Sequence, residues 1–368
     1  MKFRRYMSAI YSSALVLGLT FLLYPQAKTT STKEKEPFPT TTPAVTSAPL
    51  LSGLTDIPDV SPLPTESVTL TPTEAPQKIH PLFTDTLSDP LPGITELVTS
   101  YINSYYKNDL EALASLVTEP SMLSPALIQA NSSGVTKVTD LKLYSKPGID
   151  GIFSVVYATY SLSYDNTSPS IPRFSEYYIK RVGNGVFLIN TAPLSTETKA
   201  ALAQARTTES VLNMAISTLI RCYNNACLTL DEQRLEQCVT NPDYLNLEYF
   251  ASRFSYTEYF SDYNFLFYPG INEFDYIVYV TYKEKIVLID TPAPCMECYY
   301  VYLDPATGNP YIYLGITSLD TDAYCAAVTQ SEPIQALAKE TNQAMTEALL
   351  ADDDLKDFYN RLVSASTP

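Results

Sequence analysis

The sequence contains no tryptophan and only one histidine, His80, among its 368 residues. Histidine is the usual general base near neutral pH, so catalytic triads of the Ser-His-Asp or Cys-His kind are excluded. A catalytic zinc ion held by several histidines is excluded for the same reason. His80 lies in a proline-rich stretch that we expect to be a linker, so the expected folded parts contain no histidine.

Basic residues are scarce in the second half of the chain. The formal net charge of −16 results from 24 Lys and Arg residues against 40 Asp and Glu residues. Only 8 of the 24 basic residues, but 23 of the 40 acidic residues, follow position 206. Binding to nucleic acid needs clustered positive charge, so we expect no nucleic-acid partner. An acidic surface favours solubility, cations or basic partners, and a solvated face is its simplest interpretation.

The first residues have the charge pattern of a membrane anchor. Three basic residues within 1–6 precede an uncharged, mainly apolar run at 7–24, whose 18 residues are just enough to span a bilayer. The basic flank predicts a cytoplasmic N-terminus at 1–6, with everything after the run outside. We therefore expect a single-pass signal-anchor at 7–24 in the cell membrane and extracytoplasmic folded domains. A cleaved signal peptide is the alternative, although the cleavage motif at 25–27 is poor.

Residues 25–90 are rich in threonine and proline and contain few aromatic residues. Such a segment cannot bury enough apolar surface to offset the entropy of the chain. We therefore expect a disordered Thr/Pro-rich stalk over 25–90. Because proline favours extended backbone, this stalk would hold the folded part away from the membrane.

The most informative feature is an internal repeat at an offset of 122 residues. The segment 147–150 (PGID) recurs at 269–272 (PGIN), and each copy leads into a run of β-branched and tyrosine residues. At the same offset, 117–120 (VTEP) recurs at 239–242 (VTNP). Matches in the same order at one offset predict two homologous domains.

We place these domains at 91–205 and 206–330. Each begins with apolar residues at helical spacing, over 94–105 and 211–223, and continues into strand-like runs separated by turn residues. Helices followed by an antiparallel meander predict the α+β class. Residues 331–368 carry another helical stripe without strands, so we expect a C-terminal helical extension that repeats the opening of a domain.

This element order resembles the NTF2-like superfamily, whose members have a cone-shaped α+β fold. The resemblance covers residues 91–330 and rests on element order and hydrophobic period. It implies two tandem NTF2-like domains. One membrane helix followed by such domains is similar to the layout of bitopic scaffold proteins of bacterial conjugation and secretion channels. Because fold does not fix function, a scaffold role is an expectation that the resemblance implies.

All six cysteines follow residue 221. Cys295 and Cys298 form a Cys-x-x-Cys motif and are the candidate disulfide or thiol pair. Six cysteines allow 15 pairings, so the sequence leaves the connectivity open. Structural thiols or disulfides are the preferred interpretation. A metal site that recruits Cys222 or Cys238, and a redox role, are the alternatives, and we expect no metal and no cofactor.

Tyrosines are concentrated in the second domain. In the predicted strand 276–282 neither face is polar, so both faces are expected to be covered. A sharper interpretation is a tyrosine-lined pocket in the cone. Its candidate lining residues are Tyr279, Tyr300, Tyr302 and Tyr313. An enzyme would also need an interior acid or base, whereas Asp275 and Asp290 fall at the ends of the strand, where we expect exposure.

The sequence predicts a non-enzymatic, membrane-anchored extracytoplasmic scaffold or interaction protein of the bacterial cell envelope. Its expected partners are the membrane, through the N-terminal helix, and other envelope proteins or further copies of the chain. The first alternative is a small-molecule binding or sensing module that uses the tyrosine-lined cavity. The second is an NTF2-like isomerase or dehydratase, for which no catalytic residue can be named.

Overall fold

The computed structural model describes residues 79–164, 170–183, 185–315 and 317–366. The expected cytoplasmic segment and membrane anchor, and the expected stalk up to residue 78, lie outside these ranges. Within them, no helix has both the length and the apolar character that a membrane span requires.

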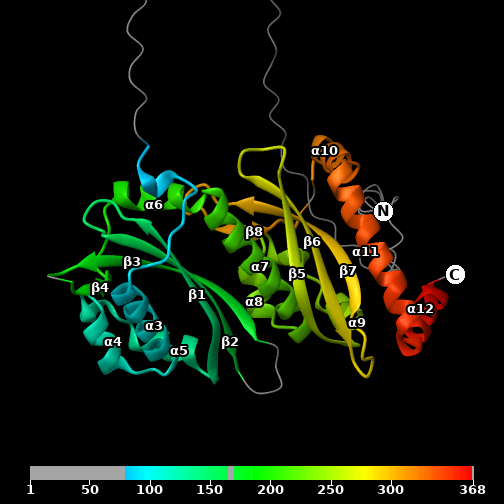
Figure 1. Ribbon diagram of the computed structural model, residues 1–368, viewed down its shortest axis with the longest axis horizontal. Coiled ribbons are helices and arrows are strands. Elements are labelled where there is room, and N and C mark those ends of the chain that lie inside the picture. Colours follow the sequence, from blue (N-terminus) through cyan, green and yellow to red (C-terminus); the bar gives the residue numbers. More distant parts are fainter. Residues whose placement is uncertain (1–78, 165–169, 184, 316, 367–368) are drawn as a thin grey trace, which may run out of the picture. The chain divides into compact units, whose positions relative to one another are not determined.

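The described chain is α+β, with two four-stranded antiparallel sheets in which the strands pair in chain order (Figure 1). The first repeat contains α3 (Pro92–Tyr106), α4 (Leu110–Leu116), η3 (Pro120–Met122), α5 (Pro125–Ser132), β1 (Lys137–Pro147), β2 (Ser154–Ser163), β3 (Ile171–Arg181), β4 (Phe187–Ile189) and α6 (Thr196–Arg206). The second contains α7 (Glu209–Thr229), α8 (Glu232–Cys238), η4 (Pro242–Tyr244), α9 (Leu247–Arg253), β5 (Thr257–Pro269), β6 (Asp275–Ile286), β7 (Ala293–Leu303), β8 (Pro310–Ile312) and α10 (Leu319–Thr329). Before them lies η2 (Pro81–Phe83), and after them α11 (Glu332–Ala351) and α12 (Asp353–Ser366).

The repeat extends to irregular details of the backbone. Asp140 and Asp262, 122 residues apart, both have positive φ (55° and 51°) in a bulge of the first strand of their sheets. A Cβ atom on Gly148 or on Gly270 would lie 2.2 Å or 2.4 Å from atoms of the chain that follows. The recurring Pro-Gly therefore marks a turn so close that only glycine fits.

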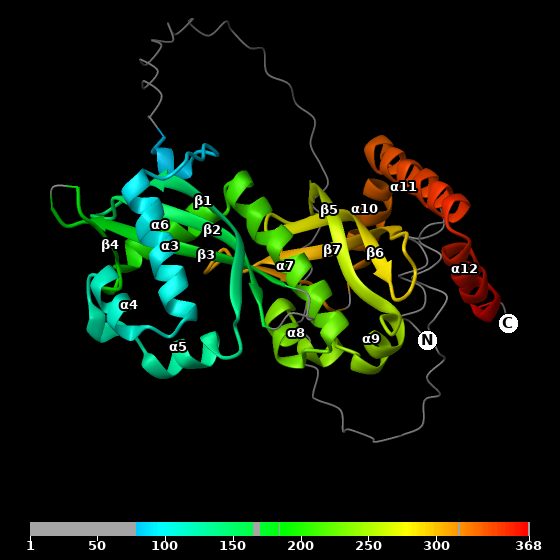
Figure 2. The same cartoon turned by 60° about the horizontal axis from the view of Figure 1, so that its bottom comes forward.

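Helix α7 joins the two repeats because it has two apolar faces. One face packs on its own sheet, where Ile216 and Ile220 contact Val278 and Val280 in one buried cluster. The other face packs on the first repeat, where Val211 is buried with Tyr157. α7 therefore lies between β3 of the first sheet and β5 of the second (Figure 2). It also contacts β8.

Helices α11 and α12 repeat only half of this arrangement, namely the packing of a helix on the sheet that precedes it in the chain. Ile334 and Ala338, at the positions of Val211 and Ala215 in α7, are buried against the second sheet, and α11 packs on β7. The positions that α7 turns toward its own sheet are polar in α11, where Gln335, Lys339 and Gln343 replace Leu212, Ile216 and Ile220. Polar outer faces are typical of the terminal units of repeat proteins. The C-terminal helical extension therefore closes the array.

The folded part begins before residue 91, where we expected the stalk to end. Leu82 of η2 is completely buried with Tyr157, and the His80 imidazole accepts a hydrogen bond from the Leu82 backbone N–H at 3.1 Å. The buried Lys146 ammonium donates to the carbonyl oxygens of Leu82 and Thr84 at 3.3 and 2.7 Å. These contacts with the sheet, which the composition of the segment does not indicate, fix the residues that precede the first repeat.

Candidate functional site

A largely apolar cavity of about 390 Å³ lies between the second sheet and the C-terminal helices. It is found where β6 ends and β7 begins, and α9, the start of β5, α11 and α12 contribute the remaining walls. Its volume is within the range of small-molecule sites, roughly 300–1,000 Å³. The apolar lining residues are Ile286, Ala293, Pro294, Met296, Met345, Leu349, Leu355, Phe358 and Leu362, and three tyrosines also line the cavity, namely Tyr256, Tyr282 and Tyr359.

The repeat shows how the wall of this cavity differs from its counterpart in the first sheet. In the first sheet, Leu162 and Ile171 are direct cross-strand neighbours, and both are buried. The equivalent neighbours in the second sheet are Glu284 and Ala293. Alanine fills less volume than isoleucine, and a buried carboxylate needs polar partners rather than apolar contacts. The substitution of this pair therefore accounts for the polar group beside the cavity and leaves less apolar volume at this position than the first sheet has.

An ion pair forms the polar wall of the cavity. The Glu284 carboxylate accepts two hydrogen bonds from the Arg253 guanidinium, each 3.1 Å long, and one from the Thr257 hydroxyl at 2.5 Å. The Cys295 thiol donates a fourth at 3.7 Å. Burial by itself raises the pKa of Glu284, but the Arg253 charge and these hydrogen bonds outweigh it and hold the pKa below its ordinary value. Glu284 is therefore ionised at neutral pH.

This arrangement is suited to binding rather than to acid–base chemistry. The Glu284 oxygens already have donors, and a carboxylate stabilised in its ionised form is a weak base. The Nε–H of Arg253 is buried and has no hydrogen-bond partner among the described residues. Buried polar groups normally have a partner, so this N–H is available to an acceptor atom on a water or a bound molecule. The site fits an apolar body that carries one hydrogen-bond acceptor.

The four tyrosines that the sequence singled out do not line this cavity. Tyr279 is buried against α10 and α11, and its hydroxyl is hydrogen-bonded to that of Thr329 at 2.6 Å. Tyr300 packs edge-on against Tyr313, with ring centroids 5.7 Å apart. Tyr302 is half-buried on β7. Tyr279 therefore packs against helices, and Tyr300 packs against a neighbouring ring.

Asp275 differs from the expectation of an exposed strand end. Its exposed fraction is 6%, and its carboxylate accepts hydrogen bonds from the Tyr300 hydroxyl at 2.7 Å and the Asn272 amide at 2.5 Å. Asp290 is exposed, as expected. The buried Asp275 carboxylate is therefore the hydrogen-bond acceptor for the hydroxyl of Tyr300, one of the four predicted tyrosines.

The two cysteines of the Cys-x-x-Cys motif lie three residues apart in the extended strand β7, so their side chains point to opposite faces of the sheet. Cys295 contacts Glu284, whereas Cys298 packs with Tyr279 on the side of α10. All six cysteines are free thiols in the structure. Cys295 and Cys298 are therefore not brought together.

Arg253 and Glu284 are not among the site residues that the sequence predicts. A signal was present, because Glu284 interrupts a run in which every second residue from Val278 is apolar or aromatic and continues with Ile286. A charge at a buried position of a strand marks either a partner or a site. Among the described residues, no group of three potential metal ligands is close enough to hold an ion.

No protein-family model matches this sequence, and no curated protein is significantly similar to it.

Proposed function

We propose that the chain is a non-enzymatic, membrane-anchored scaffold or interaction protein that acts outside the cytoplasm in a bacterial cell envelope. The anchor at 7–24 and the tandem NTF2-like assignment are parts of this proposal. The repeated order of helices and a four-stranded meander supports the NTF2-like part. The basic flank of an uncharged N-terminal run supports the anchor.

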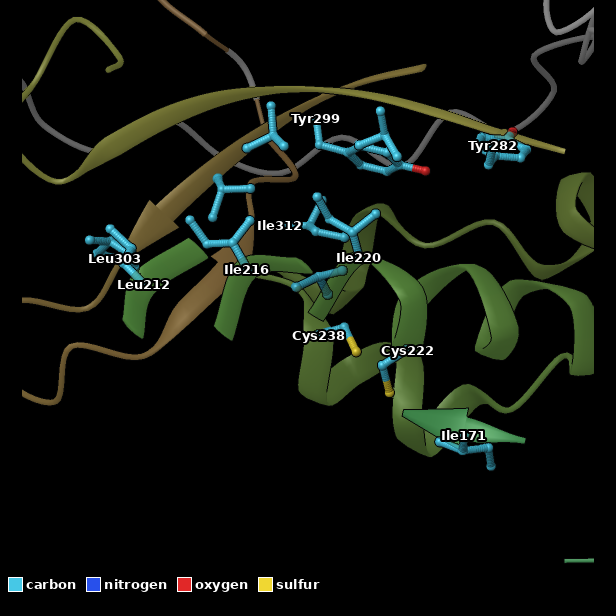
Figure 3. Close-up of a cluster of buried hydrophobic side chains, with 14 residues drawn as sticks. Ile171, Leu212, Ile216, Ile220, Cys222, Cys238, Tyr282, Tyr299, Leu303 and Ile312 are labelled. Carbon is cyan, nitrogen blue, oxygen red and sulfur yellow. The ribbon is translucent and has the colours of Figure 1, made fainter. Parts of the chain in front are cut away.

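The observation that carries the proposal is that aliphatic side chains are packed between the long first helix and the sheet of each repeat. In the second repeat Ile216, Ile220 and Val301 have an exposed fraction of 0%, and Figure 3 places the two isoleucines beside the sheet residue Tyr299. In the first repeat Ile94 and Val98 are buried in the same way. NTF2-like enzymes hold substrates in this space. Here aliphatic side chains occupy it, which favours a function at the surface.

The test uses intact cells that produce the full chain. Protease added outside should remove the folded repeats, and a membrane-impermeant amine cross-linker should join the chain to itself or to a discrete envelope protein. The matched control is a chain that lacks residues 7–24, which should lose both results. Protection from protease in intact cells would refute the location, and recovery of the accessible chain only as an uncross-linked monomer would refute the scaffold role.

The cavity favours a second function, namely reversible binding of a small apolar molecule with one hydrogen-bond acceptor. A neutral apolar dye such as N-phenylnaphthylamine should gain fluorescence with the full chain. Ala293→Ile, which introduces the residue that the first repeat has at Ile171, should fill the cavity and abolish the gain. Ala126→Ile, at an exposed position on α5, is the control and should bind the dye like the parent chain. Equal binding by both variants would contradict this function.

A further inference from the structure

Helices α7 and α8 bring two cysteines together. Cys222 and Cys238 belong to the same buried cluster, with exposed fractions of 8% and 4%. Their thiols are hydrogen-bonded to each other. Figure 3 shows the two sulfur atoms side by side, one from each helix. A pair of thiols in contact is the arrangement from which a disulfide can form with little movement.

The other cysteines have different neighbours. Cys227 is on another face of α7, where it is hydrogen-bonded to Tyr223 and packs with Leu235. Cys295 contacts Glu284, and Cys298 is hydrogen-bonded to Tyr279. Cys325 shares a cluster with Cys298, whose hydrogen bond is to Tyr279. Cys222 and Cys238 are the two cysteines that are hydrogen-bonded to each other.

The surroundings assign different roles to the two sulfur atoms. The hydrogen bond from Cys238 is the main cause that lowers the pKa of Cys222 to about 7; burial opposes it, and the charges of Arg173 and Arg234 support it. The same hydrogen bond, together with burial, raises the pKa of Cys238. The thiolate is the reactive form of cysteine, and the positive charge of Arg234 favours it at Cys222 rather than at Cys238.

We propose that Cys222 and Cys238 are a modification site that forms an intramolecular disulfide with a disulfide oxidant, either a small oxidised thiol or a thiol–disulfide exchange protein. The Cys222 thiolate attacks one sulfur of the oxidant, and the other sulfur leaves as a thiolate. Cys238 then loses its proton to solvent and its sulfur attacks Cys222, which releases the second thiolate. Two protein thiols are oxidised, and one disulfide is reduced to two thiols.

The bond would fix α8 to α7 at the junction between the repeats. Cys222 shares its cluster with Ile171 of the first sheet, and Arg234 of α8 lies over the ring of Tyr164, 5.8 Å from its centroid. The disulfide would therefore stiffen the segment through which the second repeat contacts the first. A bond between residues 222 and 238 also restricts the unfolded chain.

The test uses the full chain, first reduced, then freed of reductant and incubated with oxidised glutathione. Alkylation in denaturant and trypsin digestion should give peptide 222–234 joined to peptide 235–253, with a mass about 2 Da below that of the two reduced peptides. Because the first peptide also contains Cys227, two variants assign the bond. Cys222→Ser should lose the link, and Cys227→Ser should keep it.

Oxidation should also raise the midpoint of thermal unfolding by several degrees, and dithiothreitol should reverse the shift. Cys295→Ser, which leaves the pair intact, should show the same shift as the parent chain. Full alkylation of Cys222 and Cys238 after exposure to the oxidant would overturn the proposal. A link that persists in Cys222→Ser would overturn it as well, because Cys227 would then be the partner.

Discussion

Arg253 and Glu284 form a two-pronged ion pair at the wall of the cavity, with Nη1 donating to Oε1 and Nη2 to Oε2, both at 3.1 Å. The exposed fractions of the two side chains are only 10% and 9%. At the equivalent positions, 122 residues earlier, the first repeat has Asn131 and Leu162. The chain therefore contains its own uncharged version of the pair, which provides matched substitutions.

Glu284→Gln should destabilise the protein strongly. The change leaves the Arg253 charge buried without a counter-charge, and loss of one partner of a buried pair costs about 3–5 kcal/mol. Urea denaturation of the full chain should show this as a lower free energy of unfolding. In the control, Arg253→Asn combined with Glu284→Leu restores the residues of the first repeat and should recover most of the loss. A double variant as unstable as the single one would contradict the importance of the charge pair.

Stability should fall as the pH is lowered through the titration range of Glu284. Its pKa in the folded state is below the ordinary 4.5, so the folded state binds this proton less tightly than the unfolded state. The contribution is present above pH 4.5 and is lost as the pH falls through the folded-state pKa. Unfolding midpoints measured from pH 6 to pH 3 should therefore fall less steeply for Glu284→Gln than for the parent chain.

Glu176 provides a control because its pKa is shifted in the opposite direction. Burial raises its pKa, although the charge of Arg206 and hydrogen bonds from Arg206 and Tyr178 oppose this effect. The folded state therefore holds this proton more tightly, and Glu176 favours the folded state as the pH falls. Glu176→Gln should make the acid loss steeper. An equal pH dependence in Glu176→Gln and Glu284→Gln would show that neither carboxylate has the assigned role.

Gly270→Ala should destabilise the second repeat. The new Cβ atom would lie 2.4 Å from the Cβ of Asp275, so the turn or the strand must move. Overpacking of this kind costs about 1–3 kcal/mol. Gly148→Ala should behave in the same way, because its Cβ atom would lie 2.2 Å from the Ile152 carbonyl oxygen. Gly183→Ala meets no atom within 4 Å and should change the free energy of unfolding by less than about 0.5 kcal/mol.

Features that depend on local pattern could be predicted from the sequence. Helical spacing and the recurring Pro-Gly turn indicated helices followed by an antiparallel meander in each repeat. Both repeats have this order of elements. The absence of a polar face in the strand 276–282 predicted cover on both sides. The structure confirms this, because Val278 packs under α7 and Ile277 under α10 and α11.

Features that depend on contacts distant in sequence could not be predicted. Leu82 stands among proline and threonine residues, and its burial requires Tyr157 and a carbonyl contact with Lys146. The apolar alternation marks the position of Glu284, but its partner Arg253 lies 31 residues earlier in the sequence. The cavity likewise depends on how the C-terminal helices dock, and their helical pattern does not specify the surface that they cover.

The last prediction concerns the polar outer face of α11. Replacing Gln335, Lys339 and Gln343 by the Leu, Ile and Ile that α7 has at these positions gives α11 a second apolar stripe. Lys339 and Gln343 are exposed, so the described chain offers no sheet to bury that stripe, and the full chain should self-associate. Sedimentation velocity should show a concentration-dependent rise in sedimentation coefficient. The matched triple alanine variant should sediment like the parent chain, and an apolar variant that does the same would refute the role of this polar face as a cap.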